Sequence, residues 1–530
     1  MKIRSLSLCL LFICAALFGQ TGPPEYDILI RNGRILDGAG NPWFRGDVGI
    51  RAGIIEAVGL LDRAAARRTI DAAGHVVAPG FIDIHTHARR AILEVPTAEN
   101  YMRQGVTTLI EGNDGSSPLP LKPFLDRLRE KEISLNFGLF VGQGTVRERV
   151  MGSVNRAATA EELQKMKDLV RAAMEDGALG LSTGLFYVPG NFTPTEEVVE
   201  LARVAGCLGG IYISHMRDET AGVLESVAET IAIGERGGLP AQITHHKIIG
   251  PKNWGRSVET LRLIENARAR GVDVTLDQYP YTASSTGIAS LLPQWAQEGG
   301  RDQILKRLSD PATRARIKAV VEENIRDNRG GGNPENIVIS RCEWDTSLEG
   351  KSLARITRER GRAPSIPNAA ETAMDIVTHG SAQGVFHAID ERDVERILKY
   401  PMTMVASDGE VTVPRRGAPH PRSYGTFTRV LGVYVREKHT LALEDAIRKM
   451  SSLPAQRIGL NGRGLLRPRM RADIVIFDPE RVRDRATFAS PHQYADGFTY
   501  VLVNGALVLD DGKVTAARPG QILLGPAARR

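Results

Sequence analysis

The stretch GFIDIHTH, residues 80–87, decides the fold. Its apolar first half predicts a buried strand over Gly80–His85, and two histidines stand at the end of that strand. In a strand, residues i and i+2 point to the same side, so His85 and His87 can reach one metal ion together. Two partly exposed histidines after a strand would show the same pattern, so a metal site needs support from the rest of the chain.

Seven more apolar runs of strand length follow, and helical stretches separate them, which is typical of βα units with a parallel sheet. The predicted strands are Gly80–His85, Thr107–Glu111, Leu135–Val141, Leu179–Thr183, Gly210–Ser214, Ala241–Thr244, Asp273–Asp277 and Thr403–Ala406. The predicted helices include Ala160–Glu175, Glu196–Ala205, Val223–Arg236 and Ser257–Arg270. Eight such units favour an α/β fold of the closed (β/α)8 TIM-barrel type over an open sheet.

The two ends of the chain differ from this pattern. Residues 23–79 and 461–530 read as short strands broken by turns, and we expect them to pair into one small β-sandwich. The barrel then occupies residues 80–460. The interval between its last two strands is too long for one helix, so we expect an inserted small domain at about 288–345, over the barrel mouth, with a Gly-rich break at 330–332.

Residues 1–22 are typical of a signal peptide. Lys2 and Arg4 precede an apolar run from Leu6 to Phe18, which is too short to span a bilayer. We therefore expect a secreted or periplasmic protein with no stable membrane span in the mature chain. Outside that segment the chain has Cys207 and Cys342, which we expect to be two independent buried thiols, with a disulfide as the alternative in an oxidising compartment.

The composition argues against two classes of binding protein. The net charge is +6, but the basic residues are scattered and no basic tract reaches five residues, so nucleic-acid binding is not expected. Aromatic residues make up 5% of the chain and do not cluster, so a carbohydrate-binding scaffold has no support.

Further metal-binding side chains end other predicted strands. His215, His245 and Asp408 stand where catalytic residues of a (β/α)8 barrel collect, at the C-terminal ends of the strands. Together with His85 and His87 they predict a metal site at the barrel mouth. His246 should point to the opposite face and pack. The remaining histidines have no such placement and are expected to be structural or on the surface, namely His75, His379, His387, His420, His439 and His492.

Five motifs carry a family resemblance, namely GFIDIHTH, ISHMRDE, ITHHK, DQYPYTASST and SDG in this order. They resemble the amidohydrolase superfamily, whose barrels are of the metal-dependent hydrolase type. With LGLSTGLFY they are most similar to its N-acyl-D-amino-acid deacylases, over about residues 26–520. The resemblance implies one or two zinc ions, with His85 and His87 at one position and His215 and His245 at the other.

One position departs from the family pattern. The family places a bridging cysteine in a GNCG-like turn, whereas residues 112–115 read GNDG, so Asp114 replaces the thiolate. An aspartate can ligate zinc and can bridge through its two oxygens. Glu111 is the alternative carboxylate, and a turn-forming role for Asp114 stays open. No lysine lies within residues 179–187, so a bridging carboxylated lysine is excluded.

These residues predict the hydrolysis of an N-acyl-D-amino acid. A bound zinc ion would make water nucleophilic at neutral pH, and Asp408 would accept its proton and pass it to the departing amine. The resemblance implies that Lys247, Tyr187, Tyr279 and Ser285 line the pocket and hold the α-carboxylate of this small-molecule substrate. Arg422 could add a bidentate contact.

Three alternatives remain open at this stage. A cyclic-amide hydrolase or a D-amino-acid dipeptidase would use the same metal residues with another pocket. A catalytically dead binding barrel is a third possibility, against which the intact Asp408 and histidine pairs speak.

Overall fold

Eight parallel strands form the wall of a barrel in the computed structural model, which describes residues 25–529. Each lies where the sequence predicted a strand. They are β6 (Phe81–Asp83), β7 (Val106–Glu111), β8 (Asn136–Leu139) continuing as β9 (Val141–Gly142), β10 (Gly180–Gly184), β11 (Ile211–His215), β12 (Ala241–Ile243), β13 (Val274–Gln278) and β17 (Thr403–Val405). The ladder runs β17-β13-β12-β11-β10-β9 and β8-β7-β6, and a parallel bridge between Thr86 and Gly409 joins its two ends.

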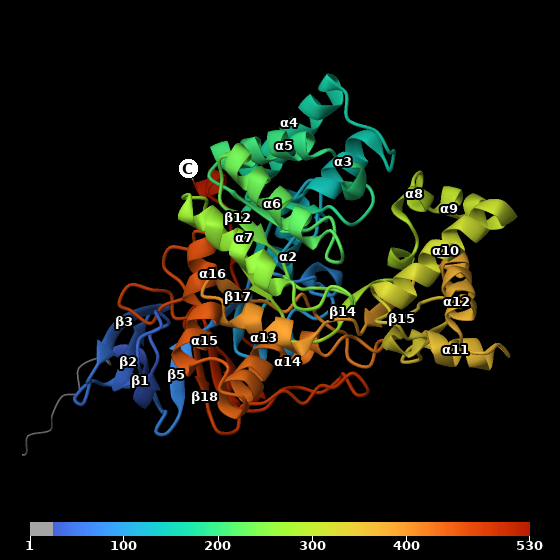
Figure 1. Cartoon of the computed structure of the whole chain (residues 1–530). Coiled ribbons are helices and arrows are strands. Elements are labelled where there is room, and N and C mark those ends of the chain that lie inside the picture. The colour runs from blue at the N-terminus through green and yellow to red at the C-terminus, as the bar shows by residue number, and fades with distance from the viewer. Residues whose placement is uncertain (1–24, 530) are drawn as a thin grey trace, which may run out of the picture.

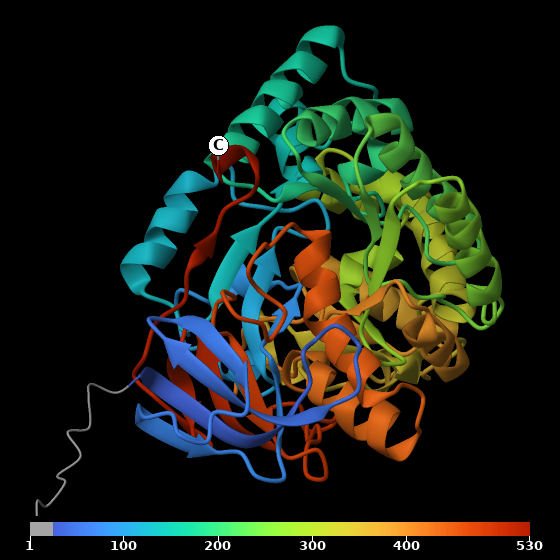
Figure 2. The same ribbon diagram turned by 90° about the vertical axis from the view of Figure 1, so that its left-hand side faces the viewer.

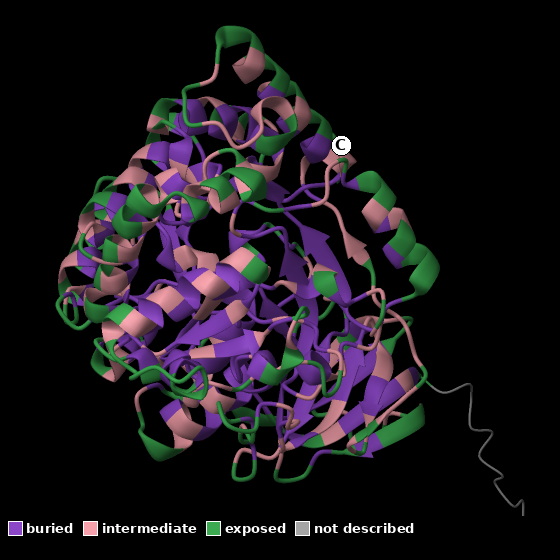
Figure 3. Ribbon diagram, turned by 90° about the vertical axis from the view of Figure 1, so that its right-hand side faces the viewer, coloured by how far each residue is buried: buried purple, intermediate pink, exposed green. Residues whose placement is uncertain are grey.

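Helices surround these strands, and Figure 3 shows the strands as a buried centre inside a ring of partly exposed helices. The four predicted helices are confirmed as α4 (Ala160–Asp176), α5 (Thr195–Cys207), α6 (Val223–Gly237) and α7 (Ser257–Ala269). Local sequence sets their ends: Thr159 and Glu162 form a reciprocal capping box at the start of α4, and Gly177 ends it in the left-handed conformation. The others are α1 (Glu99–Met102), α2 (Lys122–Lys131), α3 (Gln143–Met151), α13 (Glu391–Lys399), α14 (Arg422–Arg429), α15 (Leu443–Met450) and α16 (Ser452–Arg457).

Strands from both ends of the chain pair beside the barrel, as expected (Figure 2). They are β1 (Tyr26–Ile35), β2 (Phe44–Arg51), β3 (Ile54–Gly59), β4 (Ala66–Asp71), β5 (Val76–Pro79), β18 (Ile474–Phe477), β19 (Phe498–Val503), β20 (Ala506–Asp510) and β21 (Lys513–Val514). They form one nine-stranded sheet rather than two separate sheets, because β18 bonds directly to β5. An isolated bridge between Ile54 and Arg471 folds this sheet round its own core.

The insertion is longer than the expected 288–345. Its antiparallel sheet β14 (Ser284–Gly287), β16 (Gln383–Phe386) and β15 (Ile337–Arg341) pairs its first strand with its last, so it runs to Phe386. Its helices are α8 (Gln294–Gln297), α9 (Gly300–Ser309), α10 (Pro311–Asp327), α11 (Leu353–Glu359) and α12 (Ile366–His379), packed round a separate core. Figure 1 shows this lobe, in yellow, projecting from one side of the barrel.

The C-terminal segment adds a strand that the sequence did not predict. Strand β22 (Ile522–Leu523) pairs in parallel with β8, and Figure 2 shows this red segment running along the barrel wall. Of the two thiols, Cys342 is buried, but Cys207 is exposed because it ends α5, which corrects the expectation of two buried cysteines.

Two expectations concern membranes and export. The predicted signal peptide, residues 1–22, lies outside the described residues. Among residues 25–529, no helix is both long enough and apolar enough to cross a bilayer.

Candidate metal centre

The strand ends bring all six predicted metal-binding residues to one place at the barrel mouth. Asp408 follows β17, and its backbone N–H donates to the carbonyl of His85, 2.9 Å away, which ties the last strand to the first. Asp408 and Asp114 both have positive φ angles, of 50° and 55°. Aspartate tolerates this left-handed conformation better than most residues, and here it turns each carboxylate into the barrel.

Asp114 lies at the centre of the cluster. Its Oδ1 is 3.5 Å from Nε2 of His85, 3.7 Å from Nδ1 of His215 and 3.4 Å from Nε2 of His245. Its Oδ2 is 3.4 Å from Nε2 of His87. One carboxylate therefore contacts all four histidines, and Asp114 belongs to both groups of ligand atoms: one with His85, His87 and Asp408, the other with His215 and His245.

These spacings fit a transition metal. Zinc bonds of about 2.0 Å in a tetrahedron place neighbouring ligand atoms about 3.3 Å apart, which is close to the contacts of Asp114. Both ring nitrogens of His85 and of His215 are buried without a hydrogen-bond partner, as is Oδ1 of Asp114. Buried polar groups are rarely left unpaired, so these orphaned atoms favour one or two cations held between them.

The carboxylates are held in the charged form. Burial alone would raise the pKa of Asp114, but His85 and His245 outweigh it and hold that pKa well below its usual range. Burial alone would also raise the pKa of Asp408, but Arg422 and then His85 outweigh it and lower that pKa. In return, burial lowers the pKa of His87, but Asp114 and Asp408 raise it to about 10.

Two buried carboxylates orient the histidines from behind. Glu219 has its Oε1 3.3 Å from Nδ1 of His245 and its Oε2 3.7 Å from Nε2 of His215. Asp277 accepts a hydrogen bond from the backbone N–H of His245 at 2.7 Å, and its Oδ1 is 3.7 Å from Nδ1 of His85. Carboxylates in this position fix the tautomer and direction of ligand imidazoles. Sequence reasoning assigned neither residue a role, although Glu219 follows His215 by four residues within the quoted ISHMRDE motif.

Lys247 and Arg422 both reach the mouth, and each already has an acidic partner. The Nζ of Lys247 donates to Glu219 Oε1 and lies 2.8 Å from Nδ1 of His245. Arg422 places Nη1 2.8 Å from Oδ2 of Asp408. Arg422 and Lys247 flank the ring of Tyr279, at 4.7 Å and 5.7 Å from its centre.

A cavity of about 910 Å³ opens over this cluster. Apart from His85, which is fully buried, every residue that the sequence predicted for the site lines it: His87, Asp114, Tyr187, His215, His245, Lys247, Tyr279, Ser285, Asp408 and Arg422. The hydroxyl of Tyr187 bonds to Thr286, 3.1 Å away, whereas the buried hydroxyl of Tyr279 has no partner. Ser284–Gly287, Arg329 and Gln383 bring the insertion into the cavity wall.

The remaining predictions for this region concern residues outside the cluster. His246 bonds to Thr260 at 2.8 Å and is buried, as expected for a packing residue. Glu111, the alternative carboxylate, accepts the backbone N–H of Arg89 at 2.9 Å and belongs to neither group of ligand atoms. His420 accepts the backbone N–H of Arg422 at 3.0 Å, so this structural histidine helps to place Arg422.

Comparisons with known proteins agree with this geometry. Residues 68–509 match the amidohydrolase family. The chain is 38% identical to the D-aminoacylase of Alcaligenes xylosoxydans xylosoxydans, over 96% of this chain and all of that protein. It is 37% identical to the N-acyl-D-glutamate deacylase of the same organism, over 94% of this chain and 96% of that protein.

A solved structure shares both fold and sequence. The crystal structure of N-acyl-D-glutamate deacylase from Bordetella bronchiseptica, complexed with zinc and a phosphonate inhibitor that mimics the tetrahedral intermediate, superposes with a TM-score of 0.80. It is 36% identical, and the match covers 94% of this chain and 99% of that one. The chain therefore belongs to the amidohydrolase family, in its N-acyl-D-amino-acid deacylase branch.

Proposed function

We propose that this protein hydrolyses the amide bond of N-acyl-D-amino acids, with one or two zinc ions, and releases a carboxylate and a D-amino acid. The observation that carries the proposal is the sharing of Asp114 between two groups of ligand atoms, directly below a cavity that also contains Asp408. The names of the full-length relatives support the substrate class and the D configuration. Zinc held by His85, His87, Asp114, His215, His245 and Asp408 would polarise the amide carbonyl and activate water.

Asp408 is the general base and then the general acid. Its Oδ1 points toward His87, 3.0 Å away, at the metal cluster, while Oδ2 is paired with Arg422. The Asp408 carboxylate would accept the proton of the attacking water and then pass it to the nitrogen of the departing amine, while its ion pair with Arg422 holds it in place.

The wall above Asp408 offers anchors for the α-carboxylate of the substrate. The hydroxyl of Tyr279 is buried and unpartnered, so it can donate to a ligand without breaking a hydrogen bond within the protein. Arg422 and Lys247 flank this ring, and Ser285 and Tyr187 line the same cavity. Charge-assisted hydrogen bonds from such groups are the strong ones in carboxylate recognition.

A substrate panel tests the proposal. The purified protein, loaded with zinc, is assayed against N-acetyl-D- and N-acetyl-L-amino acids, a hydantoin and a D-dipeptide. We expect hydrolysis of the N-acetyl-D series above the other three. If only the hydantoin or the dipeptide is cleaved, the deacylase assignment is wrong and the corresponding alternative replaces it.

We also propose that the enzyme acts outside the cytoplasm. This proposal rests only on the sequence of residues 1–22, which is typical of a signal peptide. Expression of the full-length gene with fractionation of the host, followed by N-terminal sequencing of the product, tests this. A product that keeps its first residues in the cytoplasm would contradict it.

A further inference from the structure

Six basic side chains line the cavity, and five of them are held by hydrogen bonds or ion pairs. Arg89 donates to the carbonyl of Ser116, Arg90 pairs with Glu410, and Arg149 donates to the carbonyl of Leu119. Lys247 and Arg422 are paired with acidic residues as described above. Arg329 is the sixth: it makes no hydrogen bond within residues 25–529, and its ion-pair partner, Oε2 of Glu219, is 3.9 Å away, farther than the closest partner of any of the other five.

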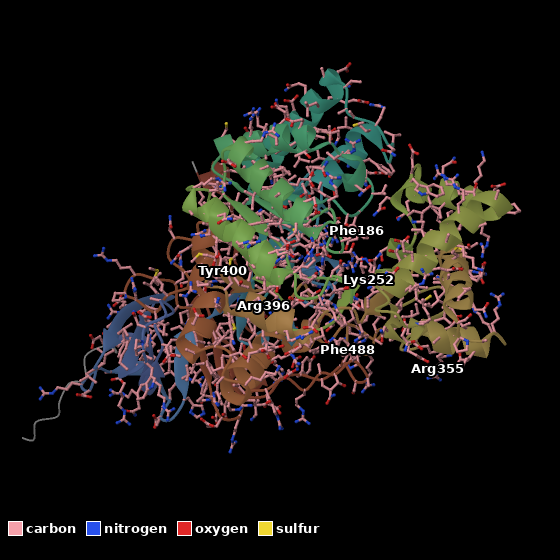
Figure 4. The ribbon with its side chains drawn as sticks, in the orientation of Figure 1. Phe186, Lys252, Arg355, Arg396, Tyr400 and Phe488 are labelled. Atoms are coloured by element: carbon pink, nitrogen blue, oxygen red, sulfur yellow. The ribbon has the colours of Figure 1, made fainter. Side chains whose placement is uncertain are left out.

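Arg329 is nevertheless buried and rigidly placed. It is 4% exposed, and its guanidinium stacks over the ring of Phe186, 4.3 Å from the ring centre. Figure 4 shows Phe186 on the side of the barrel that faces the insertion. The donors of a buried guanidinium need hydrogen-bond acceptors, because polar groups left without one inside a protein are costly. The open cavity beside Arg329 is the place from which such a partner can come.

The Gly-rich break at 330–332 holds Arg329 in this position. The N–H of Gly330 donates to the carbonyl of Asn324 and that of Gly332 to the carbonyl of Ile325, so the turn closes back onto the end of α10. A side chain at Gly330 would lie 2.2 Å from the carbonyl oxygen of Ile325, so only glycine fits there.

Residues of the barrel also contact this turn. Lys252, labelled in Figure 4, is 2.8 Å from Asp327, just before Arg329. A side chain at Gly250 would lie 2.5 Å from the carbonyl oxygen of Asp327. The loop after β12 and the end of α10 are therefore in close contact, and this contact fixes the direction of Arg329 toward the metal site.

We propose that Arg329 binds a second carboxylate of the substrate, the one on an acidic side chain, and makes this enzyme selective for N-acyl-D-amino acids of the glutamate and aspartate class. The inference rests on the proposed function, which assigns the α-carboxylate to Arg422, Tyr279 and Lys247. Arg329 lines the same cavity, makes no hydrogen bond within residues 25–529, and offers a planar donor pair that suits a carboxylate bidentately. A neutral side chain cannot accept such a charge-assisted, bidentate pair of hydrogen bonds, so an acidic side chain is favoured.

The test compares two substrates of nearly equal shape, N-acetyl-D-glutamate and N-acetyl-D-glutamine, in the zinc-loaded full-length enzyme. We expect the wild type to favour the glutamate by about tenfold or more in kcat/KM. Arg329→Gln should lower kcat/KM for the glutamate by about ten- to a hundredfold and change that for the glutamine much less. Arg329→Lys keeps the charge and should retain part of the preference.

Arg149→Gln is the matched control, because Arg149 lines the same cavity but is already bonded to a backbone carbonyl. Its ratio of the two kcat/KM values should equal that of the wild type. Equal losses on both substrates in Arg329→Gln would show that Arg329 only supports Glu219, and an unchanged ratio would show no role. Either result overturns the inference while hydrolysis of the glutamine still supports the proposed function. If the wild type hydrolyses neither substrate nor any other N-acyl-D-amino acid, the proposed function itself is wrong.

Discussion

At the scale of single residues, Asp408 combines a strained backbone with close contacts to two basic side chains. Its φ of 50° would be costly for most side chains, and its two oxygens face His87 and Arg422. Strain that persists at such a position is typical of functional sites. We predict that Asp408→Asn lowers kcat by about 10² to 10⁴, because an amide of the same shape cannot accept a proton.

The control for this substitution is Asp511→Asn, which makes the same change at a similar φ of 48° in a turn remote from the cavity. It should leave kcat within the error of the assay. Zinc content and the far-ultraviolet circular dichroism spectrum are measured for both variants. A kcat for Asp408→Asn within tenfold of the wild type would place the base elsewhere.

Asp114 is predicted to be a metal ligand that can be exchanged for a thiolate. Asp114→Cys restores the residue of the family and should keep zinc, because a thiolate can also bridge two ions. Asp114→Asn keeps the left-handed turn but removes the negative charge of a residue shared by both groups of ligand atoms, so its zinc content should fall. Metal analysis of the two purified variants decides the point, and full zinc and activity in Asp114→Asn would reduce Asp114 to a turn former.

Lys247 is predicted to bind the carboxylate of the substrate as well as to form an ion pair with Glu219. Lys247→Met should lower kcat/KM for N-acyl amino acids by about ten- to a hundredfold, and should affect an N-acyl amine without a carboxylate much less. The quantity measured is the ratio of the two substrates before and after the substitution. Because Nζ also contacts His245, an equal loss on both would mean that Lys247 acts only through the metal site.

At the scale of elements, the sequence was most informative where one strand determines the geometry. The period of two along a strand predicts that His85 and His87 share a side, and the barrel rule predicts that His215, His245 and Asp408 join them. The sequence did not reveal Glu219 and Arg329, because a loop brings each of them to the site. In a loop, unlike a strand, side chains do not alternate sides in a regular way. The length of the insertion was also missed, because β16 is short and pairs with a strand nearly a hundred residues earlier, a contact that local patterns do not contain.

The short strand β22 is predicted to stabilise the barrel. The third barrel strand is divided into β8 and β9. Its second part, β9, pairs with β10, whereas β8 pairs with β22, so β22 completes the barrel wall beside β8. Leu523 packs on the barrel core but is partly exposed, so Leu523→Ala should cost less than the roughly 2–5 kcal/mol of a fully buried leucine. Truncation after Gly520 should cost more, because it also leaves β8 with an open edge.

Thermal unfolding of the wild type, Leu523→Ala and the truncated chain measures this order. Lys513→Ala, at an exposed position whose side chain makes no hydrogen bond or ion pair within residues 25–529, serves as the control and should unfold like the wild type. An unchanged midpoint for the truncated chain would show that β22 adds nothing to the barrel.

At the scale of the whole molecule, the metal centre connects parts that are distant in sequence. Its ligands come from five barrel strands or the turns after them, and the C-terminal end of the barrel is closed by the contact between Asp408 and His85. A metal ion that binds only the folded chain stabilises it, by about 4 kcal/mol when free metal exceeds Kd a thousandfold. We predict that chelation abolishes activity and lowers the unfolding midpoint, and that zinc restores both; active protein containing less than about half an equivalent of metal would contradict this.

The stabilisation by zinc should also grow with pH. In the metal-free protein the pKa of His87 is raised to about 10 and that of His245 to about 9, against burial, by the charges of Asp114 and its neighbours, whereas unfolded histidines titrate near 6.5. The stability that these two protonated imidazoles contribute is complete below about pH 6.5 and is lost as pH rises through about 9 to 10. Zinc requires the neutral imidazoles, so its apparent affinity rises over the same interval as protons compete less. The difference in unfolding midpoint between the zinc-loaded and the chelated protein should therefore widen from pH 6 to pH 9. Parallel melts at three pH values measure it, and a difference that stays constant or narrows would show that these histidines do not exchange protons for metal.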